Sequence, residues 1–253
     1  MKNPKNIMIT GAGGGLGSAL SLAYAAQGIS LFLTGRNEDR LADISAACRL
    51  KGAHVEMACI DVEDAVAMEN FIRETDKDKP LDLVIANAGI SKTLVSGEQN
   101  SSAATKVFST NLYGVLNTIH PAIPLMVKRR KGQIAIISSL ASFRGLPSAP
   151  AYSASKAAVR FYGEALRGVL KADGIGVSVI CPGFIRTPMT DINKFPMPML
   201  MDAEKAARKI KRRLEHNPAR IAFPWPLYFL MNFTGFLPPA ITDGLFSALP
   251  RKG

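Results

Sequence analysis

Six short runs of apolar residues recur along this chain, and longer stretches with helical spacing of apolar residues separate them. Continuous apolar runs are typical of strands in a parallel sheet, because helices cover both of its faces. Parallel neighbours also require a crossover connection, which is right-handed in nearly all proteins. The pattern therefore predicts an α/β fold with a doubly wound parallel sheet of about seven strands. The predicted strands are Ile7–Thr10, Ser30–Thr34, His54–Cys59, Leu83–Ala86, Gln133–Ser138 and Val177–Cys181, and the predicted helices are Leu16–Gln27, Glu38–Lys51, Asp64–Asp76, Ser101–Ile119 and Ala151–Ala172.

Composition sets limits on the class of protein. The 253 residues are 47% hydrophobic and 20% charged, which excludes a disordered, collagen-like or coiled-coil chain. Cys48, Cys59 and Cys181 lie far apart and lack Cys-x-x-Cys spacing, so we expect free thiols in a reducing compartment and no metal site. Residues 1–5 are short and polar and a strand follows at once, so we expect a cytoplasmic protein without a cleaved signal peptide.

The charge is unevenly spread along the chain. Lys and Arg number 31 against 20 Asp and Glu, which gives a formal net charge of +11. Residues 1–193 hold 21 basic and 16 acidic side chains, whereas residues 194–253 hold 10 and 4. The sequence has no repeat or linker, so we predict one domain over residues 1–253. Within it, residues 187–253 form an extension with a hydrophobic and basic composition of its own.

A glycine-rich loop, Thr10-Gly-Ala-Gly-Gly-Gly-Leu-Gly17, lies between the first predicted strand and the first predicted helix. Glycines allow a tight turn and let backbone N–H groups approach a pyrophosphate, while the helix supplies its positive amino-terminal end. A flexible turn is the alternative interpretation. The strand before the loop and the helix after it favour a dinucleotide site.

The spacing Thr-Gly-x-x-x-Gly-x-Gly resembles the fingerprint of the short-chain dehydrogenase/reductase family. Ala86-Asn87-Ala88-Gly89 resembles the family's second landmark, although Ala86 stands where members often have Asn. Pro182-Gly183 and the following Phe184-Ile-Arg-Thr187 resemble its nicotinamide-side loop. The resemblance covers roughly residues 6–190 and implies a single Rossmann-type domain and an NAD(P)-dependent oxidoreductase that acts on CH–OH groups. It also implies four catalytic residues, Asn111, Ser139, Tyr152 and Lys156.

Tyr152 and Lys156 are four residues apart on a predicted helix, so they share one face of it. An ammonium beside a phenol favours the phenolate, as does the oxidised nicotinamide, so we expect the two together to lower the pKa of Tyr152 below its ordinary value of about 10. Tyr152 would then act as the general acid or base. Ser139 would hold the substrate oxygen, with Ser138 as the competing candidate.

The resemblance gives Lys156 the nicotinamide ribose as a second partner and gives Asn111 a place in a proton relay. An Asn inside a helix can also simply cap it, kink it or face solvent.

Arg36 follows the second predicted strand, where an NAD-selective enzyme would place an acid; position 35 is Gly. We therefore predict that NADP(H) is favoured over NAD(H), with Arg36 on the 2′-phosphate. The segment Ala12–Leu16 holds no second basic residue to help it. Asp61 and Val62 resemble the family's adenine contact, although Asp61 could merely cap a helix. The full set predicted to bind cofactor is Gly11, Gly13, Gly14, Gly15, Leu16, Gly17, Arg36, Asp61, Val62, Asn87, Ala88, Gly89, Tyr152, Lys156, Pro182, Gly183, Ile185 and Thr187.

No charged residue occurs from Ile221 to Thr242. Prolines leave only Leu227–Leu237 as a helical window, about 16 Å long, which is too short for a hydrocarbon core of about 30 Å. The preceding segment Glu204–Leu214 predicts a basic amphipathic helix. It would pack in the ordinary way or rest on an anionic membrane surface, and no motif supports nucleic-acid binding.

Methionine and proline are frequent in Phe195–Met201, where family members place a mobile substrate lid. We predict that this segment and Ile221–Thr242 fold back over the substrate opening. Soft apolar side chains indicate a bulky hydrophobic substrate. The predicted lid residues are Met189, Phe195, Met197 and Met199.

These features predict an NADPH-dependent carbonyl reductase, or the reverse alcohol dehydrogenase, for a lipid-, steroid- or 3-oxoacyl-like molecule. The family habit implies a dimer or tetramer through the two long central helices, with no nucleic-acid partner. The alternative is a non-catalytic cofactor-binding sensor or a scaffold at a membrane surface. The intact catalytic set argues against a sensor, because a sensor has no need of Tyr152.

Overall fold

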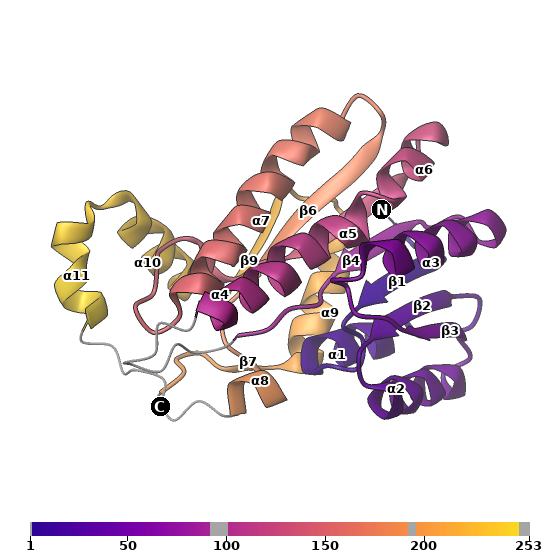
Figure 1. Cartoon of the computed structure of the whole chain (residues 1–253), viewed down its shortest axis with the longest axis horizontal. Coiled ribbons are helices and arrows are strands. Elements are labelled where there is room, and N and C mark those ends of the chain that lie inside the picture. Colours follow the sequence, from indigo (N-terminus) through magenta and orange to yellow (C-terminus); the bar gives the residue numbers. More distant parts are fainter. Residues whose placement is uncertain (1, 92–100, 192–195, 248–253) are drawn as a thin grey trace.

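A computed structural model describes residues 2–91, 101–191 and 196–247, with the side chains of residues 245–247 left out. Its centre is a seven-stranded parallel sheet in the order β3-β2-β1-β4-β5-β6-β9 (Figure 1). The predicted α/β class with a doubly wound parallel sheet is confirmed. The strands are β1 (Asn6–Thr10), β2 (Ser30–Gly35), β3 (His54–Cys59), β4 (Leu83–Ala86), β5 (Gly132–Ile137), β6 (Ile175–Pro182) and β9 (Arg220–Phe223), and a two-stranded sheet pairs β7 (Ile185–Arg186) with β8 (Met201–Asp202).

Helices cover both faces of the sheet, as the continuous apolar strands require. On β1, Ile7 and Ile9 face the core under α1, α2 and α9, whereas Met8 between them faces the core under α3, α5, α6 and α7. The described helices are α1 (Gly15–Tyr24), α2 (Glu38–Leu50), α3 (Ala65–Asp78), α4 (Ser101–Phe108), α5 (Gly114–Ile119), α6 (Ala122–Lys128), α7 (Pro150–Leu170), α8 (Pro188–Asp191), α9 (Ala203–Leu214), α10 (Trp225–Phe236) and α11 (Pro239–Ser247).

The predicted helix Ser101–Ile119 is present but not regular. A π-helical turn over Ser109–Tyr113 separates α4 from α5. This wider turn carries Asn111, whose side chain is fully buried. The helix α6, which begins after Pro121, was not predicted, since the apolar pattern was taken to end at Ile119.

The basic segment folds as α9, and the prediction of an ordinary packed helix is confirmed. Its buried side chains are Ala203, Ala206, Ala207, Ile210 and Leu214, which join the core against α1. Its basic side chains lie on the remaining face. Lys211 crosses to α1, where it donates a hydrogen bond to the carbonyl of Ala23 at 2.7 Å.

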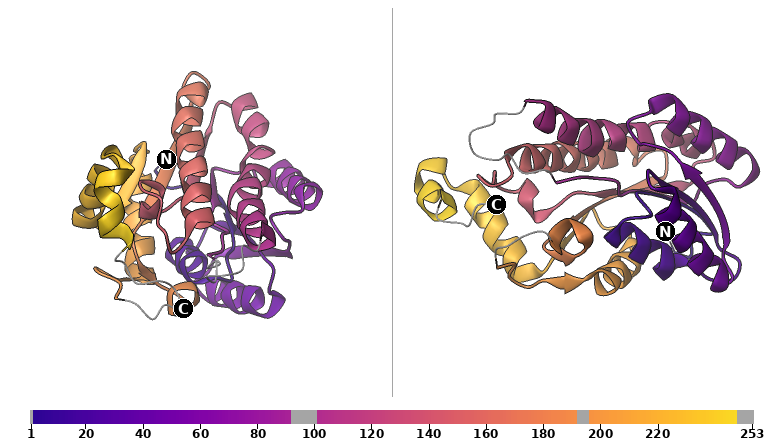
Figure 2. Two further views of the ribbon diagram at one scale, coloured as in Figure 1. Left: turned by 60° about the vertical axis from the view of Figure 1, so that its left-hand side comes forward. Right: turned by 60° about the horizontal axis from the view of Figure 1, so that its bottom comes forward.

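The uncharged stretch that begins at Ile221 has two roles in the fold. Ile221–Phe223 belongs to β9, the seventh strand, which pairs with β6. The strand was missed because it is only four residues long and begins with an arginine. After it, α10 and α11 lie together at one end of the molecule, beside the start of α7 (Figures 1 and 2). None of the described helices is long and apolar enough to cross a membrane.

Candidate active site

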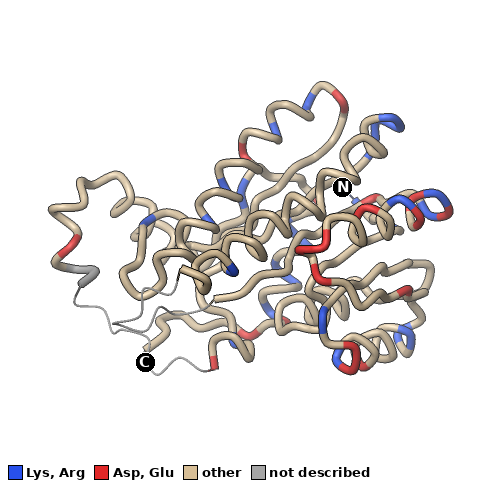
Figure 3. The backbone as a smooth tube through the Cα atoms, in the orientation of Figure 1, with Lys and Arg blue, Asp and Glu red and all other residues tan. Residues whose placement is uncertain are grey.

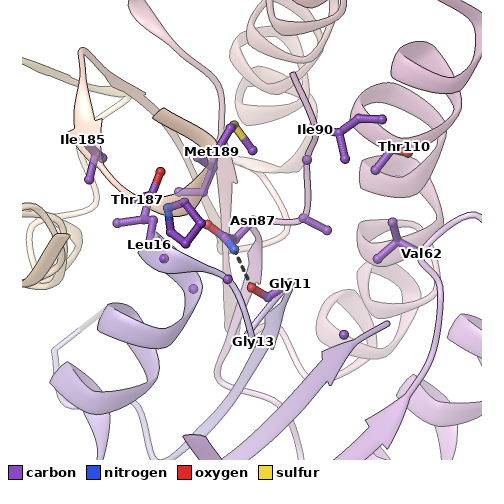
Figure 4. A pocket seen from close by; sticks show the side chains of 18 of the residues that line it. Gly11, Gly13, Leu16, Val62, Asn87, Ile90, Thr110, Ile185, Thr187 and Met189 are labelled. Atoms are coloured by element: carbon purple, nitrogen blue, oxygen red, sulfur yellow. Dashed lines mark hydrogen bonds between the residues drawn. The ribbon is translucent and has the colours of Figure 1, made fainter. Parts of the chain in front are cut away.

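A cleft of about 410 Å³ opens at the carboxyl ends of β1, β4 and β5. In the strand order, β1 connects outward to β2 on one side and has β4 on the other, so the cleft lies where the direction of winding reverses. Parallel α/β sheets bind ligands at this position, because the loops on the two sides diverge and leave a crevice. The glycine-rich loop forms one wall of the cleft, and around it lie Asn87 from the loop after β4, Ile185 from β7 and Met189 from α8 (Figure 4).

The glycine-rich loop needs its glycines for conformation and for space. Gly11 has φ +66°, which side chains other than glycine rarely adopt. A Cβ on Gly17 would run into the carbonyl oxygen of Gly11 and the amide of Asn87, and one on Gly15 would run into Thr187. The loop therefore packs tightly against its neighbours, and this wall of the cleft consists mostly of glycine backbone, together with Leu16.

Asn87 fixes the loop from β4. Its side-chain amide donates hydrogen bonds to the carbonyls of Thr10 at 2.9 Å and of Gly11 at 3.3 Å (Figure 4). The Thr10 hydroxyl accepts hydrogen bonds from the backbone N–H groups of Asn87 and Ala88 in return. These two loops are far apart in sequence, and the four hydrogen bonds hold them together at the base of the cleft.

Asn111 lies directly behind the cleft and does not line it within the described residues. Its side-chain oxygen accepts a hydrogen bond from the N–H of Ile90 at 2.8 Å, and its amide donates to the Ile90 carbonyl at 2.9 Å and to the Ser155 hydroxyl at 3.1 Å. A Cβ on Gly89 would lie 3.2 Å from both the Asn111 side-chain oxygen and the Lys156 ammonium. Asn111 therefore does not face solvent, and it lies near the lysine.

The two candidate serines follow β5 and differ in their partners. The Ser138 hydroxyl is buried and donates a hydrogen bond to the carbonyl of Lys156 at 2.7 Å, so it ties the strand to α7. The Ser139 hydroxyl accepts a hydrogen bond from the N–H of Ala141 and is hydrogen-bonded to Tyr152. Both serines line the cleft, but only Ser139 pairs with the tyrosine.

The protein's own groups raise the pKa of Tyr152, whereas the sequence predicted that Lys156 and the oxidised nicotinamide would together lower it. Burial of the hydroxyl among protein atoms raises the pKa of Tyr152, and the hydrogen bond with Ser139 acts weakly in the opposite direction. The Lys156 ammonium donates a hydrogen bond to the Ile137 carbonyl at 2.9 Å and lies 5.9 Å from the centre of the tyrosine ring. Burial also lowers the pKa of Lys156 from 10.5 to about 8. The protein alone therefore keeps Tyr152 as a neutral phenol.

Positive charge gathers at the opposite end of the cleft. Arg36 is half-exposed, and its guanidinium lies 3.6 Å from the carboxylate of Asp61. Arg40, on the first turn of α2, lines the same part of the cleft beside Gly13. Sequence reasoning looked for a second basic residue only in the glycine-rich loop and missed Arg40. Its spacing of four residues from Arg36 across a helix start could have indicated it.

All residues predicted to bind cofactor line this one cleft, as does Ser139. Of the predicted lid residues, Met189 lines it, whereas Met197 and Met199 do not contribute to it in the described chain, and Phe195 lies outside the described residues. Further lining residues that sequence reasoning missed are Gly35, Asn37, Arg40, Ile60, Ile90, Thr110, Ile137, Pro188 and Thr190.

The predicted fold-back of the uncharged stretch over the opening differs from what the described chain shows. Ile221–Phe223 belongs to the sheet, and no described residue of α10 lines the cleft, because α10 packs against the turn that follows Ser139. Met231 and Leu227 of α10 contact Leu140, which directly follows Ser139. The prediction treated a long apolar stretch as one unit, whereas the strand β9 needed part of it.

Comparisons with known proteins identify the family to which the chain is similar. Residues 5–195 match the family model described as short chain dehydrogenase. An uncharacterised oxidoreductase of Myxococcus xanthus is 35% identical over 249 residues, which cover 98% of this chain and 97% of the relative. An uncharacterised oxidoreductase of Mycobacterium tuberculosis is 34% identical and covers 94% of this chain and 96% of its own.

Solved structures share the fold over nearly the whole length. The short-chain dehydrogenase from Sphingobium yanoikuyae in complex with NADPH has a TM-score of 0.81 and 23% identity, and the match covers 98% of each chain.

Proposed function

Because the chain belongs to the short-chain dehydrogenase family of oxidoreductase enzymes, we propose that it is an NADP(H)-dependent reductase that converts a carbonyl on an apolar small molecule into an alcohol. The reverse oxidation uses the same groups. The observation that carries the proposal is the hydrogen-bonded pair of hydroxyls, Ser139 and Tyr152, in a cleft of which one wall is the glycine-rich loop.

The cleft fits a dinucleotide in two respects. The glycine-rich loop presents backbone where a Cβ on Gly15 or Gly17 would meet neighbouring atoms, and α1 begins directly after it, so its positive end faces the cleft. Two arginines stand at the far end, where the adenosine half would lie. When bound, the nicotinamide supplies the hydride that reduces the carbonyl carbon.

The chain's own groups handle the proton and the developing oxyanion. Ser139 and Tyr152 donate hydrogen bonds to the substrate oxygen, and Tyr152 then transfers its proton to that oxygen. The raised pKa of Tyr152 keeps this proton in place at neutral pH, which is the form a donor needs. Lys156 binds the nicotinamide ribose and returns a proton to Tyr152. Asn111 holds the backbone of Ile90, and the proton relay begins beside it.

A carbonyl and alcohol panel with both cofactors, monitored by nicotinamide absorbance, tests the proposal. The panel includes 3-oxoacyl thioesters, steroid ketones and long-chain ketones. The 3-oxoacyl thioesters are included because a relative from Nostoc, 29% identical over 198 residues, is named a ketoacyl reductase. Tyr152→Phe should retain cofactor affinity and lower kcat by about 10²- to 10⁴-fold. Binding of cofactor without turnover on any substrate would favour the sensor alternative.

The preference for NADP(H) rests on Arg36 and Arg40. A charge-assisted contact to the 2′-phosphate contributes about 1.5–3 kcal/mol, which is roughly 10- to 150-fold in affinity. Arg36→Ala and Arg40→Ala should each weaken NADPH and leave NADH nearly unchanged, as measured by fluorescence titration. Equal affinity of the unmodified enzyme for both cofactors would contradict the preference.

We propose two further contacts from exposed apolar side chains. Tyr113 and Phe161 are 60% and 64% exposed along the central helices, so they fit a subunit interface. Trp225, Phe229 and Phe233 are exposed on α10, which carries no charged residue, so they fit a peripheral contact with lipid (Figure 3). Light scattering measures the first, and co-sedimentation with vesicles measures the second.

A further inference from the structure

A group of charged and aromatic side chains lies behind the cleft and takes no part in the mechanism above. One face of α7 carries a polar residue at every fourth position, namely Tyr152, Lys156, Arg160 and Glu164. The first two line the cleft, whereas the other two lie further along the helix. Arg160 is only 8% exposed, and a buried charge requires a partner.

Glu164 is the partner of two arginines. One carboxylate oxygen accepts hydrogen bonds from Nε and Nη2 of Arg220 at 2.9 and 2.6 Å. The other oxygen lies 3.6 Å from Nη1 of Arg160. Arg220 begins β9, so this pairing joins α7 to the edge strand of the sheet. Without the carboxylate, two guanidinium groups would face each other with no counter-charge.

Both guanidinium groups lie against the ring of Phe143. Their central carbons are 4.4 Å (Arg160) and 5.1 Å (Arg220) from the ring centre, within the range of cation–π attraction. Tyr228 of α10 packs edge-on against the same ring at 5.3 Å, and its hydroxyl accepts a hydrogen bond from Arg220 at 3.1 Å. We call Phe143, Arg160, Glu164, Arg220 and Tyr228 the Glu164 network.

The network reaches Ser139 through a short turn. Leu140–Ser142 forms a 3₁₀ turn directly after Ser139, and Phe143 closes it by donating its N–H to the Leu140 carbonyl at 3.2 Å. Arg160 donates a hydrogen bond to the Ser142 carbonyl at 3.2 Å. On the other side of Ser139, Ser138 is bonded to the backbone of α7. The loop that carries Ser139 is therefore tied to α7 at both ends.

We propose that Glu164 is a positioning residue for the Ser139 hydroxyl, and that Tyr228 makes helix α10 part of the same supporting network. This inference rests on the proposed function, since Ser139 matters only where a substrate oxygen is held. The carboxylate keeps two arginines in place, the arginines hold Phe143 and Ser142, and these hold the turn on which Ser139 sits. A displacement of about 1 Å at such a group can cost 10²-fold in rate.

Amide hydrogen exchange tests the support directly. Glu164→Gln keeps the shape of the side chain and removes its charge, and Tyr228→Phe removes only a hydroxyl. Both should speed exchange in the peptide that covers residues 139–143, with the larger change in Glu164→Gln. The control is Glu74→Gln, an exposed carboxylate paired with Lys77 on α3, which should leave that peptide unchanged. Unchanged exchange in both network variants overturns the proposal, whether or not a substrate is known.

A double-mutant cycle with Ser139→Ala tests whether Glu164 acts through Ser139. Glu164→Gln should lower kcat/KM by about 10- to 100-fold, leave the dissociation constant of NADPH unchanged, and have almost no effect once Ser139 is already Ala. If Glu164→Gln lowers kcat/KM by the same factor in the Ser139→Ala protein as in the unmodified protein, the proposal is overturned. A lack of turnover in the unmodified enzyme would instead refute the proposed function, and the exchange result would still decide the role of Glu164.

Discussion

Replacing Lys156 by Met should make the folded protein more stable at pH 7 while it destroys cofactor binding. Lys156 is 3% exposed, and burial lowers its pKa from 10.5 to about 8. At about 1.4 kcal/mol per pH unit, this difference means that folding with the charged lysine costs about 3 kcal/mol. Methionine loses the hydrogen bond to the Ile137 carbonyl, worth about 1 kcal/mol, so the net gain at pH 7 is about 2 kcal/mol.

The gain should disappear as the pH rises. Below about pH 8 the lysine is protonated in both the folded and the unfolded chain. Between about pH 8 and 10.5 the unfolded chain keeps a proton that the folded chain has released, so the unmodified protein gains stability with pH over this interval. Above about pH 10.5 Lys156→Met should therefore be the less stable protein, by about 1 kcal/mol.

Urea unfolding followed by circular dichroism at several pH values measures the difference between the two proteins, in which other titrating groups cancel. Lys77→Met is the matched control, since Lys77 is exposed on α3 and its charge is solvated in both states. Replacing this exposed, surface-paired side chain should change the free energy of unfolding by less than about 1 kcal/mol. A constant difference for Lys156→Met between pH 7 and about 10 would refute the argument from desolvation.

Three further outcomes follow from the packing. Gly17→Ala places a Cβ against the carbonyl oxygen of Gly11, so it should abolish NADPH binding and cost roughly 1–3 kcal/mol of stability; normal titration and melting curves would contradict the close packing. Asn111→Leu leaves both backbone groups of Ile90 unpaired and should cost about 2–4 kcal/mol in urea unfolding, whereas a cost below about 1 kcal/mol would mean that water replaces the amide. Phe229→Ser combined with Phe233→Ser should reduce co-sedimentation with vesicles without lowering Tm, and equal sedimentation of both proteins would argue against a lipid contact.

The sequence by itself determined the features that local spacing encodes. Short β-type runs predicted six of the seven strands of the main sheet, and most of these are apolar throughout because helices cover both of their faces, whereas the edge strand β3 is largely exposed. The spacing of four between Tyr152 and Lys156 placed them on one helix face, and the glycines of residues 11–17 indicated a loop that lies close to other backbone. These are properties of short segments, so they can be predicted without knowledge of distant neighbours.

Only the tertiary structure decided what depends on long-range contacts and on burial. The strand β9 is too short and too polar at its start to be recognised before β6 is seen to lie beside it. Glu164 and Arg220 are 56 residues apart, and their pairing behind Ser139 exists only once α7 and β9 meet. Burial raises the pKa of Tyr152, an effect that the spacing of Tyr152 and Lys156 along the chain could not indicate. Spacing along a chain shows which charges could meet, but the cost of removing each from water depends on every atom that the fold packs around it.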